Sequence, residues 1–352
     1  MAKVVSTALA AIRCRYQSRE IAIAIGFSRW KELFLRNLLL DREVIFVECT
    51  TALRVARFIL RRRQVHGVVW SLKDEELGIP PKLLSDLAIE RIEDGFVRSI
   101  GRGIDQTMPW SLCVDKTGIY YDATRPSNLE YLCNNFDRNA FKAVERNVGI
   151  AMDLLLSSGL TKYNSLARKA AGPIARPNSN AILVLGQVED DRSLTRNLNA
   201  VSTNRDLLAR AIADNPNSTI YLKQHPDCLG ERRRPGYVEI ASSSGILEID
   251  HGVTLPDALA SVNTVYTISS LGGFEALLRG KQVVTFGAPF YAGWGLTKDH
   301  VSFPRRTRSL TVLQLFYVAY MLYPIYLNPR TGERLTLVEV IRHLTDAQEP
   351  DL

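Results

Sequence analysis

Four strand-like runs in the second half of the chain are each followed by residues whose types could do chemistry. The segments after these strands are "QVEDDRS" (187–193), "HPD" (225–227), "SSLGGFEALLRGK" (269–281) and "FGAPFYAGWGLT" (286–297). In an open α/β sheet, ligands usually bind beyond the carboxyl ends of the strands. We therefore expect the carboxylates, histidine, hydroxyls and glycines of these segments to converge on one ligand site.

Three consecutive carboxylates, Glu189, Asp190 and Asp191, stand in the first segment. One interpretation is a solvated acidic turn. In a second, one of them acts as a base or attacks an anomeric carbon. In a third, they hold a divalent metal ion, since carboxylates suit hard cations. Nothing else in the sequence favours a metal, so we predict no metal site.

The histidine and the serines each have a structural and a functional interpretation. His225 follows Lys223 at a strand end, and Pro226 fixes the backbone after it. It is either a structural or exposed residue, or it contacts a phosphate or acts as an acid on a leaving group. Ser269 and Ser270 precede glycines and a helix, so they either bind a phosphate at the helix N-terminus or cap that helix.

The segment 286–297 is rich in glycine and aromatic residues. Glycines let the backbone turn and let another molecule approach closely. Aromatic side chains offer flat apolar faces with polar edges. The segment is therefore either a turn that covers core or part of a binding pocket.

The first half contains two further candidate loops, "ERIEDGFVRSIG" (90–101) and "GIYYDATRPSNLE" (118–130). The acidic pair of Glu93 and Asp94 suits a catalytic loop on the acceptor side. Arg98 and Arg125 could hold an anionic sugar, because a guanidinium matches a carboxylate with two parallel hydrogen bonds. The structural alternative is that these arginines pair with Asp94 and Asp122.

Composition limits the class of protein. The chain has 352 residues, 46% of them apolar and 23% charged, which argues against disorder. Its net charge of +7 suits a phosphate-bearing substrate, an anionic membrane surface or nucleic acid. Basic clusters occur at "LRRRQ" (60–64) and "PRRTR" (304–308), and we expect solvated faces there. No nucleic-acid-binding motif accompanies them, so nucleic acid is not predicted as a partner.

The cysteines and the apolar stretches suggest a cytoplasmic protein. Five cysteines lie far apart, in no metal-ligand spacing, as reduced thiols do. The N-terminal residues lack a convincing cleavage site. The apolar stretch 310–327 contains Gln314 and Pro324, which predicts a buried helix ending near the proline and not a membrane span. Peripheral contact with the inner membrane through the basic surface is a further hypothesis.

Strand-like and helical runs alternate in both halves, which predicts parallel sheets with helices on their faces. A segment rich in proline and polar residues, 170–181, reads as a hinge between domains. We therefore predict an α/β protein with two Rossmann-type domains and a cleft between them. The expected ranges are 1–172 for an acceptor-side domain, 181–330 for a donor-binding domain and 331–352 for a C-terminal helix.

Taken together, these segments resemble the KpsC-type capsule polysaccharide proteins, the β-Kdo glycosyltransferases of Gram-negative bacteria. The matching stretches run in the family's order and are "EDGFVRSIG", "GIYYDATRPSNLE", "GQVEDDRS", "KQHPD", "SSLGGFEALLRGK", "FGAPFYAGWGLT" and "YPIYLNPRTGE". The resemblance implies a GT-B-like fold and transfer of Kdo from CMP-Kdo with retention of configuration, with no other cofactor. The larger members carry two catalytic modules, whereas this chain has room for one.

The resemblance also implies roles for particular residues. The family's glutamine-x-x-x-aspartate motif falls on Gln187 to Asp191, which selects Asp191 as the carboxylate that forms a sugar–enzyme adduct. The resemblance places His225 and Pro226 beside the CMP phosphate. Ser269 and Ser270 are expected at the phosphate or cytidine, with Gly273 in the same segment and Glu275 at the ribose. Tyr291 and Trp294 are expected around the sugar or base. Glu93 is the catalytic candidate on the acceptor side.

The expected acceptor is a glycolipid or a Kdo-containing saccharide of capsule or lipopolysaccharide assembly. Two alternatives stay open. One is a transferase that uses another CMP-activated acid sugar, for which the same residues would serve. The other is a non-catalytic assembly or export component that kept the fold.

Overall fold

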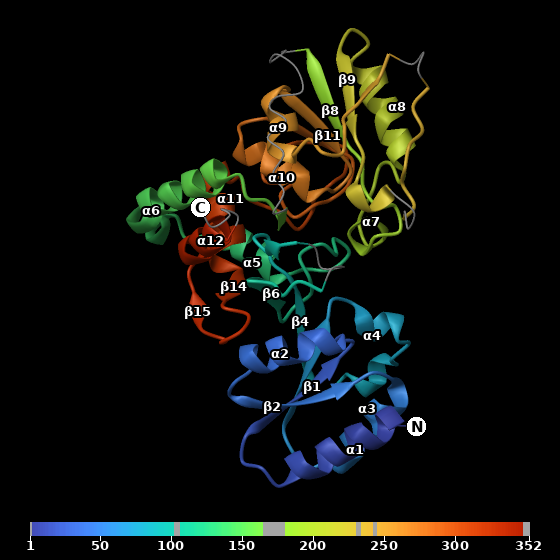
Figure 1. Ribbon diagram of the computed structural model, residues 1–352, viewed down its shortest axis with the longest axis vertical. Helices are drawn as coiled ribbons and strands as arrows, with labels where there is room; N and C mark the ends of the chain where they lie inside the picture. The colour runs from blue at the N-terminus through green and yellow to red at the C-terminus, as the bar shows by residue number, and fades with distance from the viewer. Residues whose placement is uncertain (1, 102–105, 165–179, 230–233, 242–244, 348–352) are drawn as a thin grey trace. The chain divides into compact units, whose positions relative to one another are not determined.

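The computed structural model describes residues 2–101, 106–164, 180–229, 234–241 and 245–347, which fall into two compact units. The first unit comprises residues 1–119, 160–166 and 320–352, and the second comprises 120–159 and 167–319. Each unit contains its own sheet with helices packed on it (Figure 1). The predicted α/β class is confirmed.

In the first unit, the described residues form a seven-stranded sheet in the order β15-β14-β6-β4-β3-β1-β2. Neighbours among β1 to β4 are parallel, whereas β6, β14 and β15 pair antiparallel. A separate pair of short strands, β5 and β7, is parallel. The strands are β1 (Glu20–Ile25), β2 (Arg42–Val47), β3 (Val65–Trp70), β4 (Ala88–Asp94), β5 (Ser99–Ile100), β6 (Ser111–Asp115), β7 (Tyr163–Asn164), β14 (Pro324–Leu327) and β15 (Arg334–Leu335).

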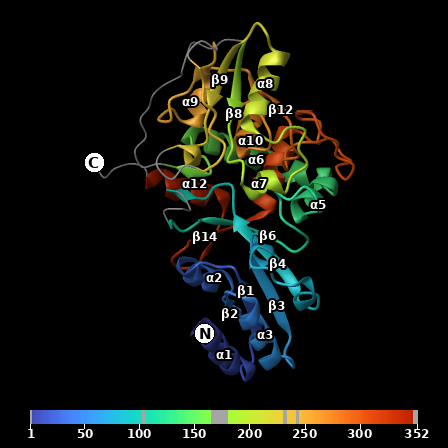
Figure 2. The same ribbon diagram turned by 90° about the vertical axis from the view of Figure 1, so that its right-hand side faces the viewer.

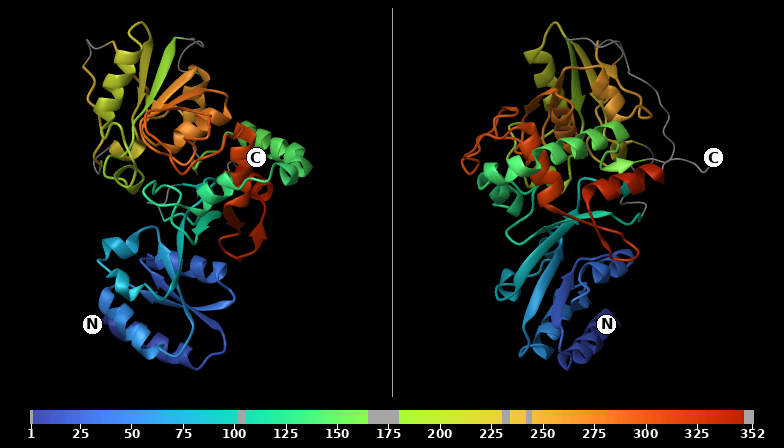
Figure 3. Two further views of the ribbon diagram at one scale, coloured as in Figure 1. Left: turned by 180° about the vertical axis from the view of Figure 1, so that it is seen from behind. Right: turned by 90° about the vertical axis from the view of Figure 1, so that its left-hand side faces the viewer.

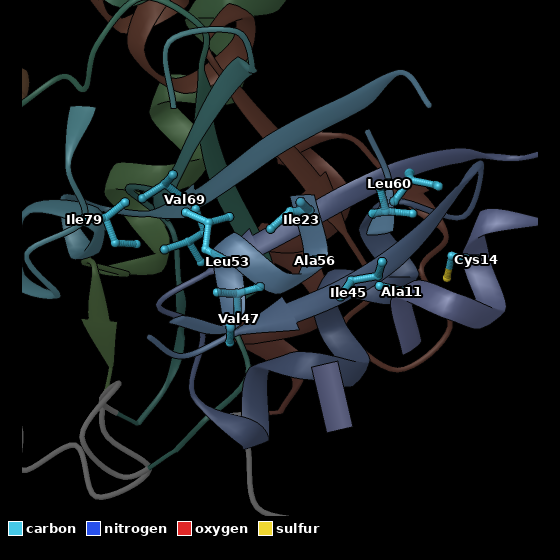
Figure 4. Close-up of a cluster of buried hydrophobic side chains, with 13 residues drawn as sticks. Ala11, Cys14, Ile23, Ile45, Val47, Leu53, Ala56, Leu60, Val69 and Ile79 are labelled. Atoms are coloured by element: carbon cyan, nitrogen blue, oxygen red, sulfur yellow. The ribbon is translucent and has the colours of Figure 1, made fainter. Parts of the chain in front are cut away.

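Helices cover both faces of this sheet, so β1, which lies between β3 and β2, is almost continuously apolar. Ile21, Ile23 and Ile25 pack against two helices on one face, as Figure 4 shows for Ile23, whereas Ala22 and Ala24 face the opposite side. Figure 2 shows α1 and α3 side by side. The helices of this unit are α1 (Ala2–Arg15), η1 (Arg29–Lys31), α2 (Glu32–Leu38), α3 (Thr50–Ile59), α4 (Lys73–Glu76), η2 (Pro81–Leu83) and α12 (Leu337–Asp346).

In the second unit, the described residues form a six-stranded parallel sheet in the order β10-β9-β8-β11-β12-β13. Helices lie on both sides of these strands (Figure 3). The strands are β8 (Ala181–Leu185), β9 (Thr219–Lys223), β10 (Leu247–Glu248), β11 (Thr264–Thr267), β12 (Gln282–Thr285) and β13 (Lys298–Asp299). The helices are α5 (Asn128–Asn134), α6 (Arg138–Ser158), α7 (Arg192–Thr195), α8 (Asn204–Asp214), η4 (Pro226–Cys228), α9 (Leu255–Ala260), α10 (Leu271–Leu278) and α11 (Val312–Phe316).

The division of the chain differs from the predicted ranges. Residues 120–159 belong to the second unit, and residues 320–352 belong to the first. The C-terminal residues belong to the first unit because β14 pairs with β6, about two hundred positions earlier in the chain, although β14 follows the strands of the second unit in sequence. The apolar stretch 310–327 is accordingly not one helix but α11, a π-helical turn η5 (Tyr317–Leu322) and β14. Most of the predicted hinge, 170–181, lies outside the described residues.

The basic run 304–308 is not the solvated face that we expected. Arg305 Nε lies 2.7 Å from Glu130 Oε1. The side chain of Arg306 is only 5% exposed, and it donates hydrogen bonds to the carbonyl oxygens of Pro289 and Ala292 at 2.6 and 2.5 Å. These arginines therefore tie α5 to the loop that follows β12.

Replacing Arg306 with methionine should lower the free energy of unfolding by about 3 kcal/mol, because buried partners lose a charged donor. Urea denaturation monitored by circular dichroism measures this change. Arg205→Met, at an exposed position of α8, is the matched control and should shift stability by less than about 0.5 kcal/mol. Equal stability of the two variants would contradict the structural role of Arg306.

Candidate active site

The side chain of Gln187 joins the ends of two neighbouring strands, β8 and β11. It is buried. Its Oε1 accepts a hydrogen bond from the backbone N–H of Ser269 at 2.7 Å and one from Thr267 Oγ1 at 3.4 Å. Its Nε2 donates to Ser269 Oγ at 3.2 Å. The segments that begin at 187 and 269 were expected to converge, and this amide joins them.

Ser193 extends the connection to Asp191. Ser269 Oγ donates to the backbone carbonyl of Ser193 at 3.1 Å. The backbone N–H and the hydroxyl of Ser193 both bond to Asp191 Oδ1, at 2.9 and 2.8 Å. Asp191 thereby caps the short helix α7. One hydrogen-bonded chain thus runs from Gln187 through two serines to the predicted nucleophile.

The three consecutive carboxylates have different surroundings. Glu189 Oε1 accepts a hydrogen bond from the backbone N–H of Asn204 at 2.7 Å, so it stabilises the start of α8. Asp190 and Asp191 are 54% and 44% exposed, and Arg234 lies 2.7 and 3.6 Å from their carboxylates. The structure therefore separates Glu189, which has a structural role, from two half-exposed aspartates beside a cation.

Asn204 supports this segment and escaped the sequence analysis. Its buried amide accepts from the backbone N–H of Gln187 at 2.9 Å and donates to the carbonyls of Gln187 and Gly236, both at 2.6 Å. A Cβ on Gly236 would lie 2.4 Å from the Gln187 carbonyl, so glycine is required there. A lone asparagine at the first position of a helix gave no signal in the sequence.

His225 lies at the carboxyl end of β9, where the sequence predicted it. Its Nδ1 accepts a hydrogen bond from the backbone N–H of Asp227 at 3.1 Å and so caps η4, which begins at Pro226. Because Nδ1 accepts, the proton of the neutral ring is on Nε2. The histidine therefore has a structural role through one nitrogen, and its orientation is fixed.

Ser270 caps α10 by accepting from the backbone N–H of Gly272 at 3.2 Å. Its backbone N–H donates to Thr267 Oγ1 at 3.0 Å, and its carbonyl accepts from the Tyr291 hydroxyl. A Cβ on Gly273 would lie 2.2 Å from that hydroxyl oxygen, so glycine lets Tyr291 pack against the helix. The capping alternative therefore holds for Ser270, and phosphate binding there stays a prediction.

The aromatic segment 286–297 is mainly core. Tyr291 and Trp294 are fully buried, and Tyr291 stacks on Phe274 at 5.8 Å between ring centroids. Trp294 Nε1 donates to the carbonyl of Phe290 at 2.8 Å. Burial raises the pKa of Tyr291 above its usual range. The interpretation of this segment as a turn that covers core is therefore correct for Tyr291 and Trp294. Contact of these side chains with a donor stays a prediction.

Glu275 is also buried. It lies on α10, and its Oε2 is 3.7 Å from Arg279 Nη1, one turn later. The ribose contact that the resemblance implies for Glu275 stays a prediction.

In the first unit, the acidic pair of Glu93 and Asp94 forms the carboxyl end of β4. Asp94 is paired with the fully buried Arg98, whose Nε lies 2.7 Å from Asp94 Oδ2. Arg98 also donates to Ser99 Oγ and to the carbonyl of Thr107, at 2.6 and 2.8 Å. The structural alternative is therefore correct for Arg98. Arg125, in the second unit, is 45% exposed and lies 3.5 Å from Asp122 Oδ2.

Glu93 has a perturbed environment. Its Oε1 accepts from the backbone N–H of Asp94 at 2.9 Å. Burial raises the pKa of Glu93, the neighbouring Asp94 carboxylate raises it further, and Lys162 and Lys31 lower it. A carboxyl whose pKa is raised is a candidate for proton transfer.

Lys31 is a second residue that the sequence analysis missed. This lysine is buried, and its Nζ lies 3.0 Å from the centroid of the Trp70 ring and 5.0 Å from that of Trp30. Burial lowers the pKa of Lys31 to about 8, although Asp94 and Glu93 oppose this change. A cation held by aromatic rings beside two carboxylates sets the charge balance of the acidic pair.

Among the described residues, no group of three or more histidine, cysteine, aspartate or glutamate side chains is placed to hold a metal ion. Within the same residues, no helix has both the length and the apolar content that crossing a membrane requires.

Comparison with known proteins identifies the family. The sequence profile of the capsule polysaccharide biosynthesis proteins matches residues 84–155 and 161–329, which is more than half of the chain. The chain belongs to this family. The resemblance inferred from the motifs is thereby confirmed, and the family match covers the acidic pair of the first unit as well as the motifs of the second.

Relatives in this family have related roles. The lipopolysaccharide-processing protein LpsZ of Rhizobium meliloti is 35% identical over 331 residues, which are 93% of this chain and 75% of LpsZ. The capsule polysaccharide modification protein LipA of Neisseria meningitidis is 37% identical over 250 residues. This match covers 70% of the chain but only 34% of LipA, so the chain corresponds to about a third of that larger relative.

Two solved structures share the fold. They are described as the β-Kdo 2,4 transferase and the β-Kdo 2,7 transferase of Thermosulfurimonas dismutans KpsC, and each is 30% identical to this family member. The TM-scores are 0.73 and 0.74, and the matches cover 94% and 93% of this chain and 99% of both solved chains. The similarity of this chain to the 2,4 transferase is therefore nearly the same as its similarity to the 2,7 transferase.

Gln187→Met keeps the size of the side chain but removes its amide, leaving the buried N–H of Ser269 without its acceptor. We expect the free energy of unfolding to fall by about 1–3 kcal/mol, the cost of an unsatisfied buried polar group. Chemical denaturation measures the change, and Gln282→Met, at an exposed position of β12, is the control. A loss no larger than in the control would show that the amide does not hold the strand ends together.

Lys31→Met removes a positive charge that lowers the pKa of Glu93, so that pKa should rise further. Titration of the Glu93 carboxyl carbon by NMR measures the change directly. Lys116→Met is the control. Lys116 is exposed, and its Nζ lies 3.5 Å from Oε1 of Glu90, which is on the same strand as Glu93, β4. An unchanged or lowered pKa of Glu93 in Lys31→Met would refute the charge balance described above.

Proposed function

We propose that this protein is a retaining β-Kdo glycosyltransferase that transfers Kdo from CMP-Kdo to a glycolipid or saccharide acceptor in capsule or lipopolysaccharide assembly. Family membership supports a role in surface polysaccharide synthesis, and the two KpsC transferases support Kdo as the sugar. The observation that carries the proposal is the chain of hydrogen bonds from Gln187 to Asp191. It positions a half-exposed carboxylate on the same sheet edge as the predicted donor segments.

In the first step, Asp191 attacks the anomeric carbon of Kdo. A bond forms between a carboxylate oxygen and that carbon while the bond to the phosphate oxygen breaks, and CMP leaves with the electron pair. Oδ1 is held by both donors of Ser193, whereas Oδ2 is 3.6 Å from Arg234. We assign the attack to Oδ2, because Oδ1 is committed to the helix cap.

In the second step, an acceptor hydroxyl attacks the same carbon and displaces the Asp191 carboxylate. Two displacements restore the original configuration, which is the general logic of retaining transfer. The hydroxyl proton passes to a general base. Glu93 stays the candidate that the sequence gives for this role, and burial raises its pKa. Arg125 is half-exposed and is the proposed contact for an anionic acceptor group.

Donor binding is assigned to the second unit. Nε2 of His225 is the proposed donor to the CMP phosphate, because Nδ1 is occupied by the cap. The backbone N–H groups at the start of α10 and the serines that precede it supply further hydrogen bonds in this proposal. No step requires a metal ion, so the reaction should proceed in the presence of EDTA.

Asp191→Asn should abolish adduct formation, because an amide is a poor nucleophile and its oxygen can keep the contact with Ser193. Intact mass spectrometry after incubation with freshly generated CMP-Kdo and EDTA measures the expected gain of one Kdo in the native protein. Asp190→Asn is the matched control, since Asp190 is equally exposed and contacts the same arginine.

The pattern of results separates the alternatives. A Kdo adduct in the native protein and in Asp190→Asn, but not in Asp191→Asn, supports the proposal. An adduct that persists in Asp191→Asn removes this residue as nucleophile. Release of CMP from another CMP-activated acid sugar, with none from CMP-Kdo, would overturn the choice of donor.

A further inference from the structure

Helix α1 has apolar residues on two opposite faces. Ala11 and Cys14 are buried against the first sheet. On the other side, Val5, Leu9, Ile12 and Tyr16 recur at helical spacing and are 49% to 82% exposed. At about 100° per residue, Val5, Leu9 and Ile12 share one face of the helix, roughly opposite the buried one, and Tyr16 follows directly after the helix ends at Arg15. We call these four residues the apolar stripe.

Helix α3 lies beside α1 on the same face of the sheet, as the shared core of Figure 4 shows. Its buried side carries Leu53 and Ala56. Its outer side carries Arg54 and Phe58, which is 69% exposed, and Arg61 lies in the turn directly after the helix ends at Ile59. The outward sides of both helices therefore contribute to one surface of the first unit.

Positive charge is concentrated on these two segments. Residues 2–19 contain four lysines and arginines, residues 50–64 contain five, and neither segment contains an acidic residue. Their joint charge of +9 exceeds the +7 of the whole chain, so the other residues together carry −2. The exposed members are Lys3, Arg13, Arg15, Arg19, Arg54, Arg61 and Arg62. Three of these nine cations pair with acidic residues outside the two segments, Lys3 with Glu48, Arg19 with Glu43 and Arg57 with Asp86, and the others supply the positive charge of this surface.

Aromatic and cationic groups are paired on this surface. The guanidinium of Arg61 lies 4.9 Å from the ring centroid of Phe58, and that of Arg15 lies 5.8 Å from that of Tyr16. Apolar residues in a band with arginines around it are typical of helices that lie in a membrane interface. Nucleic acid would also attract the arginines, but it offers nothing to Val5, Leu9 and Ile12.

We propose that the outer surface of α1 and α3 binds the headgroup region of an anionic lipid bilayer. The apolar stripe enters the boundary between headgroups and acyl chains, and the arginines bind lipid phosphates. The proposal is independent of the transfer chemistry, because binding to lipid requires neither donor nor acceptor. It gives the first unit a second function, which is to hold the protein at a membrane.

Flotation with lipid vesicles tests this surface. The full chain should bind vesicles that contain about 30% phosphatidylglycerol and should not bind phosphatidylcholine vesicles, and salt should weaken the binding. Leu9→Glu should weaken binding about tenfold or more, because the leucine can no longer enter the interface. Its control is Ile150→Glu, at an equally exposed apolar position of α6, which should bind normally.

A second pair of variants tests the charge. Arg54→Ser with Arg61→Ser should weaken vesicle binding on the order of tenfold, whereas Lys142→Ser with Arg146→Ser, on the exposed side of α6, should not. Circular dichroism checks that each variant is folded, and all substituted positions are exposed.

Four outcomes would overturn the proposal. One is no binding of the native protein to anionic vesicles at low salt. Another is equal loss of binding in the control variants. The third is a dimer in solution that Leu9→Glu converts to a monomer, since a second copy would then cover the stripe. Binding to a DNA duplex that is lost in the arginine variant and unchanged in Leu9→Glu, without vesicle binding, would assign the surface to nucleic acid instead.

Discussion

The second unit depends on one buried side-chain amide. Strands β8 and β11 are neighbours, but their hydrogen-bonded pairing stops at Val184 and Tyr266, before the loops that leave them. Gln187 continues the connection beyond the strands with both ends of its amide. Because unsatisfied polar groups are costly in the interior, the loops at 187–193 and 267–270 can adopt only a narrow set of arrangements. Asp191 and the start of α10 are thereby fixed together.

Several residues whose side chains could take part in catalysis instead hold neighbouring groups in place. Glu189 stabilises the start of α8, Arg98 neutralises Asp94 in the core, and His225 caps a short helix. Positioning of this kind is compatible with catalysis, since a reacting group must be held by neighbours whose own orientation is fixed. The half-exposed Asp191 has such support and remains accessible.

The arginines of this protein occupy two kinds of environment, buried and exposed. Arg305 and Arg306 neutralise Glu130 and bind carbonyl groups inside the second unit, where desolvation makes each partner necessary. Arg54, on α3, and Arg61, in the turn after it, are exposed and face solvent beside apolar side chains. In the similar run 60–64, Arg61 and Arg62 are exposed, whereas Arg63 donates to the carbonyls of Gln17 and Arg19, so only the packing of each arginine decides its role.

The sequence by itself determined the α/β class and the four strands that precede the candidate segments, because periodicity and turn residues are local properties. The resemblance of the quoted motifs, in their order, indicated the family. Only the tertiary structure decided that β14 returns to the first sheet, that Tyr291 and Trp294 are core, and that Lys31 lies against Trp70. It also identified Asn204 as the support of the Gln187 loop. These features depend on contacts between residues far apart in the chain, which local patterns do not specify.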